Sequence, residues 1–294
     1  MKGLFSRRTI AYVFCSLGLF ILLFGLSFPV RGKDKNQNAP ELVFLGDSIV
    51  GECRYEDGIP ARVGKKLHMK SLNGAFGGTK MSRIDIDRRM DDNRDGLSLA
   101  SLSKAIASQD FGVQQMVHIN EGGTGFFDEA IDALDATDFS KMKILILEYG
   151  LNDYHQATPI DNPLNPYDEY TFLGAMRSAV RTLKKAYPDV RIVMVTPTYS
   201  WYLSQELTCE NYDTGNGYLE KYVNAQILTA KELDLEIIDL YHDFYPHEKY
   251  KDWKKYTRDG IHPNEKGRKK IAKKIANYLK GKETQDDDDA GSTD

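Results

Sequence analysis

An apolar stretch that ends in a reactive group constrains this chain more than any other feature. Residues 42–45 read Leu-Val-Phe-Leu and are followed directly by Gly46, Asp47 and Ser48. A short apolar run bounded by Gly and Asp is typical of a buried strand in a parallel sheet. Open α/β sheets carry their reactive groups at the carboxyl ends of such strands. We therefore expect Ser48 to lie at the opening of a site.

A serine hydroxyl is a weak nucleophile at neutral pH unless a histidine accepts its proton and a third group orients that histidine. The far end of the chain offers both groups in Asp259-Gly-Ile-His262. Two more motifs follow predicted strands: one contains Gly78, and the other contains Asn152. A glycine amide and an asparagine side chain can donate hydrogen bonds to the oxyanion of acyl transfer.

These four motifs, in this order, resemble those of the SGNH (GDSL-type) hydrolases, and the resemblance runs from Leu42 to around Leu279. It implies the fold of that family and serine esterase or acylhydrolase activity without a cofactor. Residue by residue, it implies that Ser48 is the nucleophile, His262 the base and Asp259 the group that orients the base. It further implies an oxyanion hole made by the Ser48 amide, Gly78 and Asn152. The sequence departs from the family at Ile49, where Leu is commoner, and in a longer segment between Gly78 and Asn152.

The alternation of apolar runs and helical patterns predicts a three-layer α/β/α domain with a parallel five-stranded sheet, flavodoxin-like in layout. Strands are expected before Ser48 and before Asn73, and at 144–148, 192–195 and 236–240; helices are expected at 59–67, 171–187, 218–233 and 265–279. This hydrolase domain is predicted over residues 41–281. A polar linker, 31–40, precedes it, and an acidic disordered tail, 282–294, follows it.

Residues 1–30 predict a cytoplasmic tail and a transmembrane signal-anchor. No charged residue occurs from Thr9 to Val30, a length that suits a membrane-spanning helix. Lys2, Arg7 and Arg8 precede it, so we expect a single-pass protein of the cell membrane with an extracytoplasmic catalytic domain. The alternative is cleavage of a signal peptide near residues 25–27, which would give a secreted protein.

Composition excludes some classes of partner. The formal net charge is −4, and positive residues are dispersed among acidic ones rather than gathered into a basic domain, so nucleic acid is not an expected partner. No obligate protein partner can be inferred. Cys53 and Cys209 are the only pair in the main domain that could form a disulfide, and the sequence does not decide whether they meet.

Two acidic clusters raise the question of a metal. Residues 91–96, Asp-Asp-Asn-Arg-Asp-Gly, fit the opening of a calcium loop, but Leu102 stands where the bidentate Glu would be. A solvated acidic turn is therefore favoured over a calcium site involving Asp91 to Asp95. His242 and His247 lie near two aspartates in a spacing that matches no familiar metal site, so no metal is predicted.

Aromatic residues gather between Thr196 and Tyr218 without a clear period, which favours a loop at the carboxyl end of the sheet. Such rings either stack on sugar rings or acyl chains, or pin the loop to the domain. Tyr154 and His155, which follow Asn152 closely in the sequence, are expected at the edge of the pocket. The candidate substrate-binding residues are Asp47, Tyr154, His155, Tyr199, Trp201 and Tyr202.

The predicted function is a membrane-anchored extracytoplasmic serine hydrolase that cleaves short-chain acyl esters, with O-acetyl esters of carbohydrates as the expected substrates. Short acyl groups are favoured because neither the insertion nor the aromatic segment contains a long apolar run. The alternatives are an acyltransferase that uses the same residues, a lipase or lysophospholipase-type acylhydrolase, and a non-catalytic carbohydrate-binding module.

Overall fold

The computed structural model describes residues 39–84, 93–117, 119 and 126–281. The predicted membrane-spanning segment, Thr9–Val30, and the acidic tail lie outside these residues. Within the described part, no helix is both long and apolar enough to cross a bilayer. The chain divides into two units, 1–33 and 34–294, and every described residue belongs to the second.

A five-stranded sheet in which every strand pairs in parallel forms the centre of the domain, in the order β2-β1-β3-β4-β7. This is the flavodoxin-like strand order, so the predicted α/β fold with a parallel five-stranded sheet is confirmed. The strands are β1 (Leu42–Gly46), β2 (Ser71–Asn73), β3 (Ile144–Glu148), β4 (Arg191–Val195) and β7 (Glu236–Ile238).

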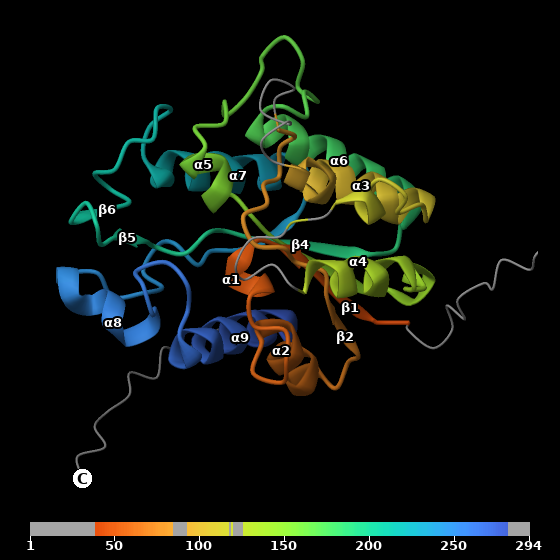
Figure 1. Cartoon of the computed structure of the whole chain (residues 1–294), viewed down its shortest axis with the longest axis horizontal. Coiled ribbons are helices and arrows are strands. Elements are labelled where there is room, and N and C mark those ends of the chain that lie inside the picture. Colours follow the sequence, from red (N-terminus) through yellow and green to blue (C-terminus); the bar gives the residue numbers. More distant parts are fainter. Residues whose placement is uncertain (1–38, 85–92, 118, 120–125, 282–294) are drawn as a thin grey trace, which may run out of the picture. The chain divides into compact units, whose positions relative to one another are not determined.

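Helices cover both faces of the sheet. Figure 1 shows α2 (Ile59–Leu67) and α9 (Glu265–Leu279) together on one face, and α3 (Leu99–Ser108), α6 (Phe172–Ala186) and α7 (Leu219–Glu232) on the other. The shorter elements are α1 (Ser48–Gly51), α4 (Phe127–Asp135), α5 (Leu151–His155), α8 (Trp253–Tyr256) and the 3₁₀ turns η3 (Asn93–Leu97), η4 (Gln114–Met116), η5 (Phe139–Lys141) and η6 (Tyr250–Asp252).

The long helices form where the sequence combines an apolar stripe with a capping side chain. Thr171 caps α6 by accepting a hydrogen bond from the Gly174 amide, and Asn264 caps α9 by accepting one from the Gly267 amide. The buried face of α9 consists of small and apolar residues, and its other face is largely lysine and arginine. The bounds predicted for α2, β3 and α9 agree with the structure.

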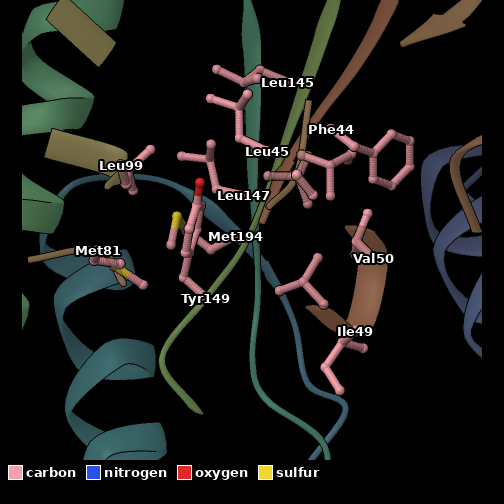
Figure 2. Close-up of a cluster of buried hydrophobic side chains, with 14 of the residues drawn as sticks. Phe44, Leu45, Ile49, Val50, Met81, Leu99, Leu145, Leu147, Tyr149 and Met194 are labelled. Carbon is pink, nitrogen blue, oxygen red and sulfur yellow. The ribbon is translucent and has the colours of Figure 1, made fainter. Parts of the chain in front are cut away.

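The core lies on both sides of the central strands, because side chains alternate across a strand. Figure 2 shows Phe44 and Val50 on one side of β1, and Leu45 and Leu147 on the other, toward Leu99. These five side chains are buried. The five strands run in the same direction, so their carboxyl ends lie at one edge of the sheet, and this brings the motif residues together.

The aromatic segment after β4 is more regular than expected. It contains a small antiparallel hairpin, β5 (Trp201–Tyr202) and β6 (Leu207–Thr208), where the sequence favoured an irregular loop. Both residues of β5 are buried, and the Trp201 amide donates to the Gly260 carbonyl at 2.9 Å. The hairpin therefore packs against the segment that carries His262.

Candidate active site

Ser48 lies where β1 ends and α1 begins. Asp47 caps this short helix, and its Oδ1 accepts a hydrogen bond from the Ile49 amide at 2.9 Å. Asp47 itself is fully buried. Its carboxylate therefore fixes the turn that presents Ser48, and the side chain is not available as the substrate contact that the sequence suggested.

His262 contacts both Ser48 and Asp259. Its Nε2 lies 3.0 Å from Ser48 Oγ, and its Nδ1 lies 2.7 Å from Asp259 Oδ2. The other Asp259 oxygen accepts from the Ile261 and His262 amides. Burial alone would raise the pKa of Asp259, but the hydrogen bonds from His262 and the two amides outweigh burial and lower it. Asp259 is thus ionised at neutral pH and orients the imidazole toward Ser48.

The loop that carries His262 is held by Gly260. This residue has φ +91°, and a Cβ here would lie 2.3 Å from the Trp201 carbonyl oxygen. Besides accepting from the Trp201 amide, Gly260 donates its own amide to Thr257 Oγ1 at 3.1 Å. Only glycine combines this backbone conformation with so close an approach.

A second Asp-x-x-His pair has the same local geometry. His242 Nδ1 lies 2.7 Å from Asp239 Oδ2, and Asp239 Oδ1 accepts the amides of Tyr241 and His242. The other ring nitrogen of His242, Nε2, lies 3.9 Å from Glu220 Oε1, where His262 has a serine. The contact with a serine, and not the Asp-His spacing, therefore distinguishes His262.

Asn152 and the glycines after β2 border the serine. Asn152 Nδ2 donates to Thr79 O at 3.0 Å and to Asp47 Oδ2 at 3.3 Å. A Cβ on Gly77 would lie 3.7 Å from the Ser48 Cβ, so this loop runs beside Ser48. Gly78 has φ +75° and lies against the Arg94 side chain. The structure thus brings Asn152 and the Gly77-Gly78 loop to the same edge as Ser48.

The model of the GDSL-like Lipase/Acylhydrolase family matches residues 44–270, which contain all of the motif residues described above. The chain belongs to the GDSL-like lipase/acylhydrolase family. No curated protein gives a significant match.

Solved structures share the fold of this GDSL-like hydrolase. A protein from Lactobacillus plantarum is 17% identical with a TM-score of 0.56, and the match covers 83% of this chain and 98% of that one. A protein from Chitinophaga pinensis DSM 2588, described as a possible lipase, is 19% identical with a TM-score of 0.54, covering 82% and 98%. Likeness at these identities shows the fold alone.

Arg54 follows α1 in the GDSL-like domain and binds the segment between β2 and the Gly77-Gly78 loop. Its guanidinium donates to the carbonyls of Ala75, at 2.8 Å, and Asn73, and it lies 4.7 Å above the Phe126 ring. Burial lowers its pKa to about 10, so the group still carries its charge at neutral pH. No motif pointed to Arg54, because its partners are main-chain carbonyls that the sequence does not reveal.

Charged side chains surround the His262 imidazole. Glu52 Oε1 lies 3.4 Å from His262 Nε2, and Arg258 pairs with Glu52 and lies 3.5 Å from Asp259. His155 lies within electrostatic range of His262; burial, and then the His262 charge, lower its pKa to about 4. His155 is therefore neutral at neutral pH, and its Nε2 contacts the Tyr202 hydroxyl at 2.9 Å.

The aromatic side chains expected to bind substrate are mostly buried. Tyr199 and Trp201 each expose 1% of their surface, and Tyr202 exposes 8%. Tyr199 stacks on His247 with a centroid separation of 4.2 Å. Tyr154 is also buried, with its hydroxyl bonded to the Tyr212 carbonyl. The expected stacking platform is wrong for these residues. Their rings are buried in the core, which removes a large apolar surface from water.

The candidate metal and disulfide positions have other partners. Asp91 and Asp92 lie outside the described residues, whereas Asp95 is buried and accepts hydrogen bonds from Arg83 at 2.6–3.0 Å, so the solvated turn expected there is wrong for Asp95. Within the described residues no cluster of three metal-ligating side chains occurs. Cys53 and Cys209 are both free thiols.

Proposed function

We propose that this GDSL-like hydrolase is a serine esterase in which Ser48 attacks the acyl carbonyl. The observation that carries the proposal is His262, whose two ring nitrogens contact Ser48 Oγ and ionised Asp259 at 3.0 and 2.7 Å. His262 accepts the serine proton as the Ser48–acyl bond forms, and then returns it to the departing alkoxide. The same histidine then deprotonates a water molecule, whose oxygen attacks the acyl carbonyl; the Ser48–acyl bond breaks, the acid leaves, and the proton returns from His262 to Ser48 Oγ.

The oxyanion of each tetrahedral intermediate requires donors beside Ser48. We assign this role to the amides of Ser48 and Gly78 and to the Asn152 side chain. An amide NH₂ group has only two protons, and in the free protein Asn152 directs them to Thr79 O and Asp47 Oδ2. The oxyanion would take over the longer bond, the one to Asp47 at 3.3 Å, because the 3.0 Å bond to Thr79 is the stronger anchor.

The surroundings of Ser48 support a short acyl group on a polar carrier. Glu52, His155 and Arg258 supply hydrogen-bonding groups around His262, and these suit sugar hydroxyls better than an alkyl chain. We therefore propose O-acetyl esters of carbohydrates as substrates. The apolar segment Thr9–Val30 supports export and anchoring, which would restrict the substrate to the cell envelope or its surroundings.

An active-site label tests the serine mechanism directly. A fluorophosphonate probe should label the wild-type protein and leave Ser48→Ala unlabelled, because only an activated serine reacts. Labelling of Ser48→Ala at the wild-type rate would disprove the assignment. A series of aryl esters tests the acyl group: we expect acetyl esters to be cleaved faster than octanoyl esters, and the reverse order would favour a lipolytic enzyme.

A further inference from the structure

One part of the surface is strongly basic although the chain as a whole is acidic. Between Lys249 and Lys280 the sequence contains twelve lysine and arginine residues and three aspartate and glutamate residues, against a net charge of −4 for the chain. This stretch comprises η6, α8, the loop with His262, and α9. The positive charge is therefore concentrated in the segments that precede and follow the His262 loop.

Asn264, in the middle of this stretch, joins its two helices. Its Nδ2 donates to the Lys255 and Thr257 carbonyls at 3.3 and 3.1 Å, while its Oδ1 caps α9. These bonds hold the carboxyl end of α8 against the first turn of α9, two residues after His262. Figure 1 shows α8 beside the start of α9. The lysines of α8 and of the first α9 turn thus have a fixed place beside the site.

Three exposed lysines form this basic rim: Lys254, Lys255 and Lys266. Among the residues that the structure describes, none of the three makes an ion pair. The ammonium groups of Lys254 and Lys255 instead lie 5.5 and 5.2 Å from the centroids of the neighbouring Trp253 and Tyr256 rings.

Stability accounts for only part of the basic rim. The ring contacts stabilise Lys254 and Lys255, but Lys266 lies in the first turn of α9, where the helix dipole disfavours a cation. Like charges on the two contacting helices, α8 and α9, also repel one another. Both costs are relieved when an anion binds, so the arrangement is better explained by a negatively charged partner than by folding.

We propose that the basic rim binds a polyanionic polysaccharide and holds its acyl ester at Ser48. The inference rests on the ester hydrolysis proposed above and adds the charge of the carrier. A polymer fits better than a small anion, because exposed lysines are hydrated point charges that bind weakly one at a time. Repeated carboxylates on one chain engage several lysines together, and the second contact then becomes intramolecular.

Two double variants test the proposal with the same change of charge. Lys254→Glu with Lys255→Glu alters the basic rim. Lys65→Glu with Lys66→Glu alters exposed residues in the last turn of α2, which runs from the carboxyl edge toward the opposite edge of the sheet. The substrates are O-acetylated polygalacturonate, O-acetylated xylan as its uncharged counterpart, and 4-nitrophenyl acetate.

We expect the basic-rim variant to lose about tenfold in kcat/KM on acetylated polygalacturonate at low salt, and the loss to disappear in concentrated salt, which screens exposed charges. Cleavage of acetylated xylan and 4-nitrophenyl acetate should not change. The α2 variant should stay within about twofold of wild type on every substrate, because exposed charges away from the site are screened. Equal losses in both variants, or none in the basic-rim variant, would refute the proposal.

A binding measurement keeps this inference separate from the esterase assignment. The Ser48→Ala protein should be retarded in native gels that contain polygalacturonate, and the basic-rim substitutions should remove the retardation. Absence of 4-nitrophenyl acetate cleavage by wild type would refute the esterase assignment while leaving the retardation intact. Sedimentation with anionic phosphatidylglycerol vesicles that the basic-rim substitutions abolish, without retardation by polygalacturonate, would instead identify a lipid surface and overturn the polysaccharide proposal.

Discussion

Asp47 and Glu148 bring two carboxyl groups into direct interaction next to Ser48, with 0% and 1% of their surfaces exposed. Glu148 interacts with the side chain and the amide of Asp47, and no other group among the described residues donates a hydrogen bond to its oxygens. Two carboxyl groups form a hydrogen bond only when one is protonated. Asp47 already accepts from the Ile49 amide and from Asn152, so Asp47 is the ionised partner and Glu148 holds the proton.

This shared proton makes stability depend on pH. Burial raises the pKa of Asp47 to about 6, and burial together with the Asp47 charge raises that of Glu148 well above 4.5. Because both folded-state values exceed the unfolded ones, their stabilising contribution is complete below about pH 4 and is lost as the pH rises through the folded values. Glu148→Gln keeps a donor toward Asp47 without a proton to lose. We expect it to raise Tm at pH 8 by a few degrees, roughly 2–4 °C per kcal/mol, and to have little effect near pH 4.

Glu236→Gln provides a control of opposite sign. The hydrogen bonds from Arg191 lower the pKa of Glu236, so its contribution is present above the unfolded pKa and is lost as the pH falls. This variant should lower Tm at pH 8 and converge with wild type in acid. Thermal unfolding across pH 4–8 measures both. A Glu148→Gln protein less stable than wild type at pH 8 would show that Glu148 is ionised in the fold.

The two Asp-His pairs allow a matched test of the base. His262→Ala should lower kcat/KM on 4-nitrophenyl acetate by about 10³-fold or more, because Ser48 then lacks a proton acceptor. His242→Ala removes the same kind of Asp-His bond at a position without a serine, and should leave kcat/KM within about twofold. Similar losses in both variants would mean that the effect is structural and not catalytic.

Asn152 is tested through turnover. Asn152→Ala removes an oxyanion donor and should lower kcat by about 10²–10³. Asn216→Ala is a suitable control, since the Asn216 side chain also donates to a main-chain carbonyl, that of Ala157, without approaching Ser48. Stopped-flow kinetics together with Tm separates the roles: a Tm loss in Asn152→Ala with unchanged kcat would exclude it from the oxyanion hole.

Local pattern was enough to predict the five strands, four of the helices and the motif positions, but it missed α3 and α4, which lie in the long segment between Gly78 and Asn152. The run 144–148 is apolar until its last residue, so its bounds could be read directly, and Asn264 with Gly267 marks the start of α9. The charged residue that ends this run, Glu148, was also informative. Glu148 continues a buried strand where an apolar residue would be expected, which could have pointed to a neutral carboxyl.

Tertiary packing decided the features that local pattern could not. The rings of Tyr199 and Trp201 have no helical or strand period, and only the hairpin β5–β6 shows that they are buried against the His262 loop. Arg54 binds carbonyls brought close by the sheet, so no residue type in the sequence marks its partners. The basic rim likewise depends on how Asn264 joins two helices.

The placement of the chain is a separate prediction. Thr9–Val30 would span about 33 Å as a helix, which matches the hydrocarbon core of a bilayer. We expect full-length protein to stay in the membrane fraction after alkaline washing, and protease added to spheroplasts to remove the catalytic domain. Recovery of a soluble form that begins near Phe28 would show cleavage of a signal peptide instead.

The main chain of Gly260 packs closely against that of Trp201. A Cβ at Gly260 would meet the Trp201 carbonyl oxygen at 2.3 Å, so Gly260→Ala must move the main chain two residues before His262. A displacement of about 1 Å in a catalytic group can cost about 10²-fold, and we expect a loss of that size in kcat/KM together with a lower Tm. Gly281→Ala is the matched control, because Gly281 also has positive φ, at +69°, but a Cβ there meets nothing within 4 Å. That variant should keep full activity with a small change in Tm. If Gly260→Ala lowered Tm but kept the wild-type kcat/KM and fluorophosphonate labelling rate, the hairpin would stabilise the fold without positioning the imidazole.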